Sequence, residues 1–353
     1  LNEVFEEFSK IIGVGSTAEY LKEVFQKSYL EHSNLADATR FLANELFLEE
    51  GLVIIDGDDA TLKTIFAPYI KDELVHQNSF AEVSKTISLL KEYTVQVNPR
   101  EINLFYIEDT LRERIIFENN IYKVNNTEIQ FSETEILNLL KASPEKFSPN
   151  VILRPLYQEV ILPNLAYIGG GGEIAYWLEL KSNFNSQNIT FPILMLRNSF
   201  VVATEKQMEK MEKLHLTWSD LFLPQEELIH QKTKELSIFK IDFSEQKETL
   251  QKQFAELLKI AKQTDKSFIG AVKAQETKQT KGLENLEKRL LKAEKRVHSE
   301  KLERIAEIQN QLFTNGSLQE RKSNFSEFFS KKFKNEVVSL SNPLNTHFKI
   351  IKI

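Results

Sequence analysis

The sequence predicts an α/β fold, with a doubly wound core, small inserted segments and a long antiparallel α-helical coiled coil. Three observations support this prediction. Residues 51–56 form a continuous apolar run between helical patterns, which is typical of a buried parallel strand. Residues 165–178 have the pattern of a strand, a glycine turn and a helix. After Pro224 no proline occurs until beyond residue 313, and apolar residues recur about every 3.5 positions.

The composition limits the classes of function. A chain of 353 residues can form a large core and more than one domain. A net charge of −6 argues against nucleic acid or an anionic membrane as the main partner, because both favour a basic surface. The absence of cysteine excludes disulfides, thiolate metal ligands and a cysteine nucleophile within this segment. With no signal peptide and no apolar run long enough to span a bilayer, we expect a cytoplasmic protein.

Residues 1–92 are predicted to be the C-terminal portion of the α/β core. Helical apolar spacing precedes the strand at 51–56, and Asp58 or Asp59 is placed to cap a helix that runs to about His76. Since the chain begins at Leu1, inside an amphipathic pattern, we interpret it as a fragment without its native N-terminus.

Residues 93–150 are predicted to be a small α+β connecting insertion. Ser132 and Glu135 form a capping box for a helix through Lys141. Before that helix, Asn-rich turns separate short β-like runs at 103–106, 114–117, 121–124 and 129–131.

Residues 151–223 are predicted to continue the core and to contain the glycine-rich turn. We expect a further strand around residues 193–196 and a helix near residues 205–214.

Residues 224–313 are predicted to be two long helices paired as an antiparallel coiled coil. A coiled coil commonly dimerises, so we expect a homodimer. The apolar seams that support this are Leu250, Phe254, Leu257, Ala261 and Phe268, then Leu283, Leu286, Leu290, Ala293 and Val297.

Residues 314–353 are predicted to be a helix and a strand that dock on the core. Asn315 and Gly316 end the preceding helix. Residues 347–353 are predicted to be a terminal strand. The apolar stripe of the short helix consists of Phe325, Phe328, Phe329 and Phe333.

The glycine turn has two interpretations. Its backbone N–H groups can approach a phosphate or carboxylate at the start of a helix, or it can be a tight turn that packs strand against helix. Gly170, Gly172 and Ala175 match a dinucleotide fingerprint, but no acidic residue occurs between Glu179 and Glu205 to hold the ribose. The missing acid argues against a nicotinamide dehydrogenase.

Arg154, Gln158 and Glu159 fall on one stripe of a predicted helix. Arginine suits the bidentate capture of a carboxylate or phosphate, and glutamate suits an amine or proton transfer. The alternative is an ion pair that fixes the helix to the sheet. We favour the binding site for Arg154 and, slightly, the structural role for Glu159.

Residues 96–106 mix polar and aromatic residues outside any helical period, and Arg112 and Arg114 follow them. This segment, with Asn98, Arg100 and Asn103, could line a pocket or close the sheet, and composition favours neither. Asp56, Asp58 and Asp59 could hold a divalent metal, but helix capping explains Asp58 and Asp59 more simply. The six histidines lack metal-ligand spacing, so we predict no metal site.

These segments resemble the bacillithiol biosynthesis cysteine-adding enzymes, a family of cysteine ligases. The resemblance spans essentially the whole chain. Gly171, Leu196 and Thr314 stand where the family pattern has proline, and the family's first strands have no counterpart, so we expect this fragment to be inactive alone. The matching stretches are QVNPREINLFY with Arg112 and Arg114, RPLYQEVILPNLAYIGGGGEIAYWLELKSNF, PILMLRNS and LFTNGSLQER.

The resemblance implies a core similar to nucleotidylyltransferases and class I synthetases, that is, a Rossmann-like core with inserted segments and a dimerising coiled coil. It also implies that L-cysteine is added to the amine of glucosaminyl-malate, the last step of bacillithiol biosynthesis. Forming an amide from a free carboxylate requires activation, for which ATP is the simplest source.

Roles for individual residues follow from these chemical types. Arg154 and Arg197 suit the malate carboxylates, and Glu159 or Glu173 suits the reacting amine or its proton. Tyr176 and Trp177 could pack on a sugar face, although packing in the core is commoner. The remaining predicted binding residues are Gln158, Gly169, Gly170, Gly171, Gly172, Ser199, Asn98, Arg100 and Asn103.

Two other functions remain open. The chain could be a non-catalytic α/β scaffold with a coiled coil for assembly, or a nucleotidyltransferase that uses the same sheet for another substrate.

Overall fold

The computed structural model describes residues 1–342 and 344–353. The chain divides into two compact units. The first comprises residues 1–199 and 338–347, and the second comprises residues 200–337 and 348–353.

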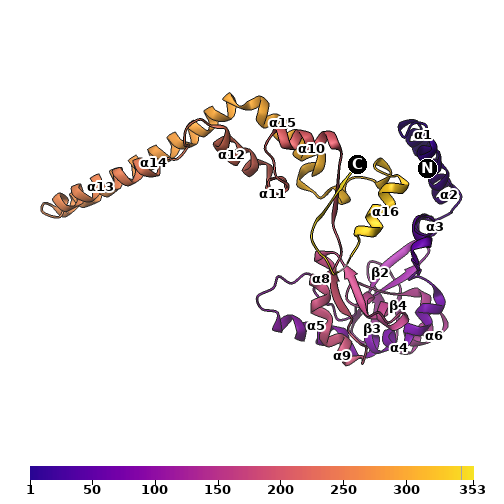
Figure 1. Ribbon diagram of the computed structural model, residues 1–353. Helices are drawn as coiled ribbons and strands as arrows, with labels where there is room; N and C mark the ends of the chain where they lie inside the picture. Colours follow the sequence, from indigo (N-terminus) through magenta and orange to yellow (C-terminus); the bar gives the residue numbers. More distant parts are fainter. Residues whose placement is uncertain (343) are drawn as a thin grey trace. The chain divides into compact units, whose positions relative to one another are not determined.

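The first unit begins with helices and then forms an antiparallel sheet (Figure 1). The sheet has five strands in the order β4-β3-β2-β1-β5, and each strand is antiparallel to its neighbour. The elements are α1 (Asn2–Ile11), α2 (Ser16–Leu30), α3 (Leu35–Phe47), η1 (Leu48–Glu50), α4 (Ala60–His76), α5 (Asn78–Leu89), β1 (Leu104–Glu108), β2 (Leu111–Glu118), β3 (Ile121–Val124), β4 (Gln130–Phe131), α6 (Glu133–Ala142), η2 (Pro144–Lys146) and β5 (Phe147–Pro149).

A βαβ unit follows the antiparallel sheet. Strands β6 and β7 are parallel, and Gly169 pairs with Leu196 at their carboxyl ends. A parallel pair requires a crossover connection, which α8 and α9 provide. The elements are α7 (Arg154–Ile161), β6 (Ala166–Gly169), α8 (Gly171–Trp177), η3 (Leu178–Leu180), α9 (Lys181–Ser186) and β7 (Ile193–Leu196).

The apolar core of the first unit joins these parts. Phe66 of α4, Leu104 of β1, Ile136 of α6 and Trp177 of α8 are buried in one cluster. Helix α4 is capped by Asp59, whose side chain accepts the backbone N–H groups of Thr61 and Leu62. The predicted cap, the capping box at Ser132 and the strands of the insertion are confirmed.

The predicted strand at residues 51–56 is wrong. The segment is extended, but no strand among the described residues pairs with it, and Val53 is 78% exposed. Its apolar sequence shows β-propensity, whereas burial depends on a neighbouring strand, which the local sequence cannot reveal.

The second unit contains a helical hairpin and a small parallel sheet. Strand β8 (Phe200–Ala203) pairs with β9 (Lys349–Lys352), so the predicted terminal strand is confirmed. The side chain of Gln319 bonds both the N–H and the C=O of Val202, which extends the pairing of β8. The other elements are α10 (Glu205–Lys213), α11 (Trp218–Leu221), α12 (Gln225–Leu236), α13 (Ser244–Ala261), α14 (Lys266–Val297), α15 (Ser299–Leu312), η4 (Thr314–Gly316), η5 (Gln319–Arg321), η6 (Phe325–Glu327) and α16 (Lys331–Leu340), the last of which extends into the first unit.

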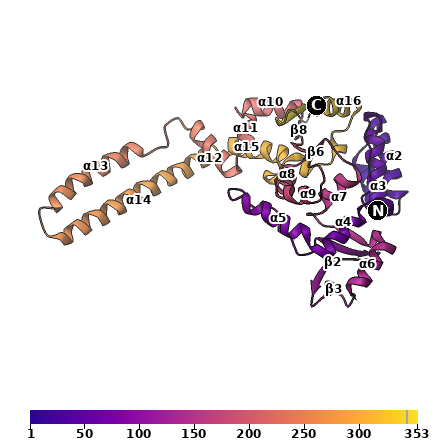
Figure 2. The ribbon, with the colours of Figure 1, turned by 90° about the horizontal axis from the view of Figure 1, so that it is seen from below.

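Helices α13 and α14 pack side by side as an antiparallel hairpin within one chain (Figure 2). Phe254, Ala261 and Val272 are buried between them, with Leu258 and Ile269 packed alongside. The packed seam therefore differs from the predicted one at four positions. The predicted seam residues that are exposed are Leu257, Phe268, Leu286 and Val297. Adjacent apolar residues make the heptad register ambiguous, and only packing selects one of them.

The predicted phenylalanine helix also differs. Phe325 lies in η6, Phe328 and Phe329 follow it, and only Phe333 is part of α16. No described helix is both long and apolar enough to cross a membrane.

Candidate functional site

A cavity of about 600 Å³ lies along α7. We call it the arginine cavity, because Arg112 and Arg154 both line it. Its walls come from the extended 53–58 segment, from β2 and β5, and from α7 with the turn that follows. The lining residues are Val53, Ile55, Gly57, Asp58, Arg112, Ser148, Pro149, Arg154, Tyr157, Gln158, Ile161, Leu162 and Asn164.

Arg154, the first residue of α7, is held by neutral partners. Its Nη2 donates to the hydroxyl of Tyr176 at 2.6 Å, and its Nη1 donates to Gln158 Oε1 at 3.4 Å. Burial alone would lower the pKa of Arg154, but the side chains of Tyr176 and Tyr167 raise it above its usual value. No carboxylate of a described residue lies within ion-pair distance of Arg154. Its positive charge is therefore available to a ligand.

Arg112 brings a second guanidinium to the same cavity. It lies in β2, opposite Ile107 of β1, and its guanidinium stacks 3.8 Å above the centre of the Phe105 ring. Within the described part of the chain it too has no carboxylate partner. Two guanidinium groups without carboxylates favour an anionic ligand, because arginine binds carboxylates and phosphates through paired N–H donors.

The extended segment that forms one wall is fixed by a buried lysine. Lys63 is 2% exposed, and its Nζ bonds the Asp58 carboxylate and, at 2.7 Å, the carbonyl of Glu145. Lys63 thus connects this wall to η2 and neutralises the one carboxylate among the lining residues. The lining residues therefore carry a net positive charge.

Tyr157 holds the same wall from the side of α7. Its hydroxyl donates to the carbonyl of Gly57 at 3.0 Å. Burial, with the nearby charges of Asp59, Asp58 and Asp56, raises the pKa of Tyr157 to about 12. The phenol therefore keeps its proton at physiological pH and remains a hydrogen-bond donor.

Gln158 lines the arginine cavity together with Arg154, whereas Glu159 has a structural position. Glu159 is 2% exposed, and its oxygens accept bonds from the backbone and side chain of Asn164 and from the side chain of Gln158. These bonds fix the turn between α7 and β6. They agree with the structural role that the sequence favoured for Glu159.

The glycine turn serves packing at its beginning and is open at its end. A Cβ atom on Gly169 would lie 2.6 Å from Tyr167 Cε1, so only glycine fits there, whereas Gly171 and Gly172 have free space. Gly169 and Gly170 are buried. The N–H of Gly170 donates to Glu173 Oε2 at 2.7 Å, so the carboxylate of Glu173 already occupies this backbone donor.

The aromatic residues of α8 face inward. Trp177 is fully buried and stacks on Tyr167 with ring centres 4.0 Å apart. This position leaves no ring face for a sugar. Tyr176 is also buried, and its hydroxyl accepts the bond from Arg154.

The 96–103 segment is tied to the core by Asn103. Asn103 is fully buried and bonds Glu73, Ser79 and the carbonyl of Arg100. Burial raises the pKa of Glu73. Asn98 and Arg100 are exposed and do not line the arginine cavity.

Arg197 and Ser199 follow β7. The backbone N–H of Arg197 donates to the carbonyl of Gly169 at 2.8 Å, which continues the pairing of β6 with β7. Arg197 does not line the arginine cavity. The arginine that lines it together with Arg154 is Arg112, which was not among the predicted binding residues. The signal for Arg112 in the sequence was only its position after the 96–106 segment.

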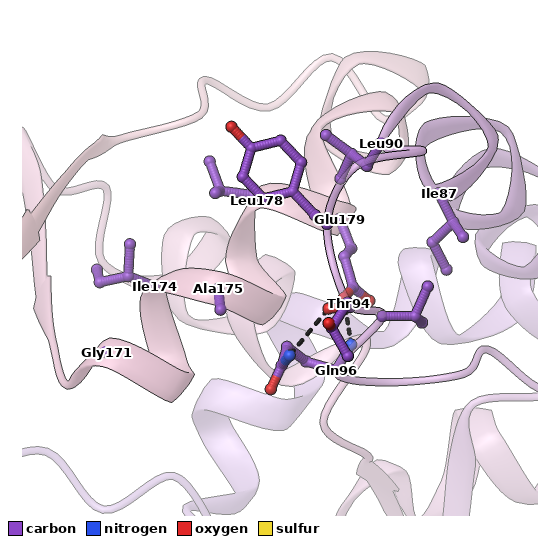
Figure 3. A pocket seen from close by; sticks show the side chains of 11 residues that line it. Ile87, Leu90, Thr94, Gln96, Gly171, Ile174, Ala175, Leu178 and Glu179 are labelled. Carbon is purple, nitrogen blue, oxygen red and sulfur yellow. Dashed lines mark hydrogen bonds between the residues drawn. The ribbon is translucent and has the colours of Figure 1, made fainter. Parts of the chain in front are cut away.

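A second, smaller cavity of about 280 Å³ lies beside α8 (Figure 3). We call it the α8 cavity. Gly171 lines it and Arg154 does not, so the glycine turn and Arg154 belong to different cavities. Its lining residues are Ile87, Leu90, Tyr93, Thr94, Val95, Gln96, Gly171, Ile174, Ala175, Leu178 and Glu179. In the described ranges no group of three or more His, Asp or Glu side chains could hold a metal ion.

Comparison with known proteins identifies two family matches that together cover almost the whole chain. Residues 1–198 match the family described as "Bacillithiol biosynthesis BshC, N-terminal Rossmann-like domain". Residues 200–353 match "Bacillithiol biosynthesis BshC, C-terminal coiled-coil domain". The boundary between the matches coincides with the main boundary between the two compact units.

Curated relatives agree with these matches. The chain is 64% identical over 355 residues to the protein named "Putative cysteine ligase BshC" of Flavobacterium psychrophilum, covering 100% of this chain and 67% of the relative. Its counterpart of the same name in Flavobacterium johnsoniae is 61% identical over 356 residues, with the same coverage. The chain spans about two thirds of the length of these relatives.

We predict that Lys63→Met loosens the arginine cavity. The substitution removes the donor to the Glu145 carbonyl and the partner of the Asp58 carboxylate, and each lost hydrogen bond costs about 0.5–1.5 kcal/mol. Hydrogen exchange should become faster at residues 56–62 and 144–147. Lys71→Met, an exposed position on the same helix, is the matched control. Unchanged exchange in the Lys63 variant would show that this lysine does not hold the wall.

Proposed function

Because the chain belongs to the bacillithiol biosynthesis BshC family, we propose that the protein is a ligase that forms a C–N bond in bacillithiol biosynthesis. The specific reaction we propose is the addition of L-cysteine to the amine of glucosaminyl-malate. L-cysteine and glucosaminyl-malate are then the small-molecule partners of the full-length protein.

The arginine cavity is the main structural support for this proposal. Glucosaminyl-malate carries carboxylates on its malate part. Arg154 and Arg112 line one cavity, and neither forms an ion pair with a carboxylate of a described residue. Arg154 is oriented by Tyr176 and Gln158, so little side-chain freedom is lost when it binds an anion. We assign the malate carboxylates to this cavity.

The amine that reacts must lose a proton as the amide forms. Of the two glutamates predicted to do this, Glu173 is exposed and, among the described residues, only its Oε2 is bonded, to the Gly170 N–H, whereas Glu159 is buried with both oxygens in use. We therefore propose Glu173 as the proton acceptor and assign Glu159 to positioning of the turn after α7.

Activation of the cysteine carboxylate by ATP remains a proposal that rests on the chemistry of amide formation. At the glycine turn, the Gly170 N–H is bonded to Glu173, so the turn as it stands does not offer this donor to a phosphate.

We predict that cells without the intact gene lose bacillithiol and accumulate glucosaminyl-malate. The measurement is a profile of low-molecular-weight thiols and their precursors in cells with and without the gene, with a plasmid copy as the control. Unchanged levels of both compounds would exclude the proposed reaction.

In the full-length enzyme, Arg154→Ala should raise KM for glucosaminyl-malate about 10- to 100-fold. Loss of a charge-assisted hydrogen bond costs about 1.5–3 kcal/mol, which corresponds to this range. Arg114→Ala is the matched control, because Arg114 lies two residues after Arg112 on β2 and does not line the cavity. Equal KM values for the Arg154 variant and the wild type would remove the arginine cavity from substrate binding.

The hairpin of α13 and α14 supports a proposal for a homodimer, since Leu257, Ile260 and Phe268 are exposed near its tip. We predict that Phe268→Ser with Leu257→Ser halves the mass measured by sedimentation velocity, while Lys252→Ser on the same helix does not. A wild-type full-length protein that sediments as a monomer would contradict this.

A further inference from the structure

The α8 cavity contains a single charged side chain among its lining residues. Most of its walls are apolar, with Ile87 and Leu90 from α5 and its end, and Ile174, Ala175 and Leu178 from the opposite side. Figure 3 shows these side chains around Glu179. A volume of about 280 Å³ is near the lower limit of ligand sites, so only a small ligand fits.

Glu179 is a buried carboxylate without a cation. It is 3% exposed, and it accepts the backbone N–H groups of Gln96 at 2.7 Å and Val97 at 3.4 Å (Figure 3 draws the bond from Gln96). No lysine, arginine or histidine in the described part of the chain lies within ion-pair distance of it. A carboxylate can accept about four hydrogen bonds, so about half of this capacity is free.

Other buried carboxylates of the chain are compensated more fully. Glu73 accepts four hydrogen bonds from Ser79 and Asn103, and Asp220 forms an ion pair with Lys232 at 3.0 Å. Neither Glu73 nor Asp220 lines the α8 cavity. Since a buried charge is costly unless it is paired, Glu179 is suited to receive a positive charge from a ligand.

We propose that the α8 cavity binds the ammonium group of a small amino acid, with Glu179 as its counter-ion. This inference rests on the proposed function and identifies the ligand as L-cysteine. The ligation must form an amide with the carboxylate of cysteine, although cysteine carries an amine of its own. Contact with Glu179 keeps that amine protonated, and a protonated amine has no electron pair with which to attack. The apolar walls receive the short thiol side chain.

Binding to the full-length protein tests this site without turnover. The probes are L-cysteine, cysteamine, which keeps the ammonium and lacks the carboxylate, and 3-mercaptopropionate, which keeps the carboxylate and lacks the ammonium. By calorimetry, cysteamine should bind at least about 10-fold more tightly than 3-mercaptopropionate, as expected for a charge-assisted hydrogen bond. Equal affinities of these two probes would overturn the proposal.

Two variants separate charge from shape. Glu179→Gln removes the charge but keeps an acceptor for the Gln96 N–H, and it should weaken L-cysteine and cysteamine binding about 10-fold or more. Glu92→Gln, exposed on the neighbouring segment, is the matched control and should bind as the wild type does. Unchanged affinity of the Glu179 variant would overturn the site.

Ala175→Leu fills the cavity and leaves Glu179 intact, so it should abolish binding. It decides the question if the Glu179 variant fails to fold, because retained affinity in a folded Ala175 variant would also overturn the proposal. The proposed function is tested independently of this site. A protein that binds cysteamine through Glu179 but does not support bacillithiol synthesis would confirm the binding site and contradict the proposed reaction.

Discussion

The hydrogen bond from Arg154 to Tyr176 is the interaction on which the candidate site depends. It connects the first turn of α7 to α8 and gives the guanidinium a neutral partner. A carboxylate in the same place would neutralise Arg154 and leave it with a structural role alone. Because the partner is a phenol, the side chain is oriented and its charge remains available. Arg112 stacks on Phe105 and adds a second positive charge that also has no carboxylate partner among the described residues.

The two cavities of the first unit differ in the charge of their lining residues. The arginine cavity has two guanidinium groups and one carboxylate that Lys63 already neutralises, whereas the α8 cavity has one buried carboxylate and no cation among its lining residues. The proposed reaction joins an acidic sugar derivative to an amino acid and would use both kinds of site. Helix α8, which lines the α8 cavity, is held by Trp177, which is fully buried against Tyr167. The same helix carries Tyr176, which orients Arg154, so its rigid packing supports both sites.

Local signals in the sequence predicted much of the fold. The cap at Asp59, the box at Ser132 and the alternating strands of the insertion depend on neighbouring residues, and the structure contains all of them. The prediction of a buried strand at residues 51–56 was wrong, because the burial of a strand depends on a neighbouring strand that the local sequence does not reveal. The seam of the hairpin shifted from Leu257 to Leu258 for a similar reason, since both residues are apolar and only packing chooses between them.

The site was harder to predict because polar residues look alike in a sequence whether they bind a ligand or the core. Asn103 was a candidate binding residue, but its backbone N–H bonds the buried Glu73. Arg112 and Arg154 are far apart in the sequence, and only the fold places both in the lining of one cavity. The most direct test of the central claim is a crystal structure of the full-length protein with glucosaminyl-malate. We expect a malate carboxylate within hydrogen-bond distance of the Arg154 and Arg112 guanidinium groups. A malate group bound elsewhere, with both arginines unoccupied, would contradict it.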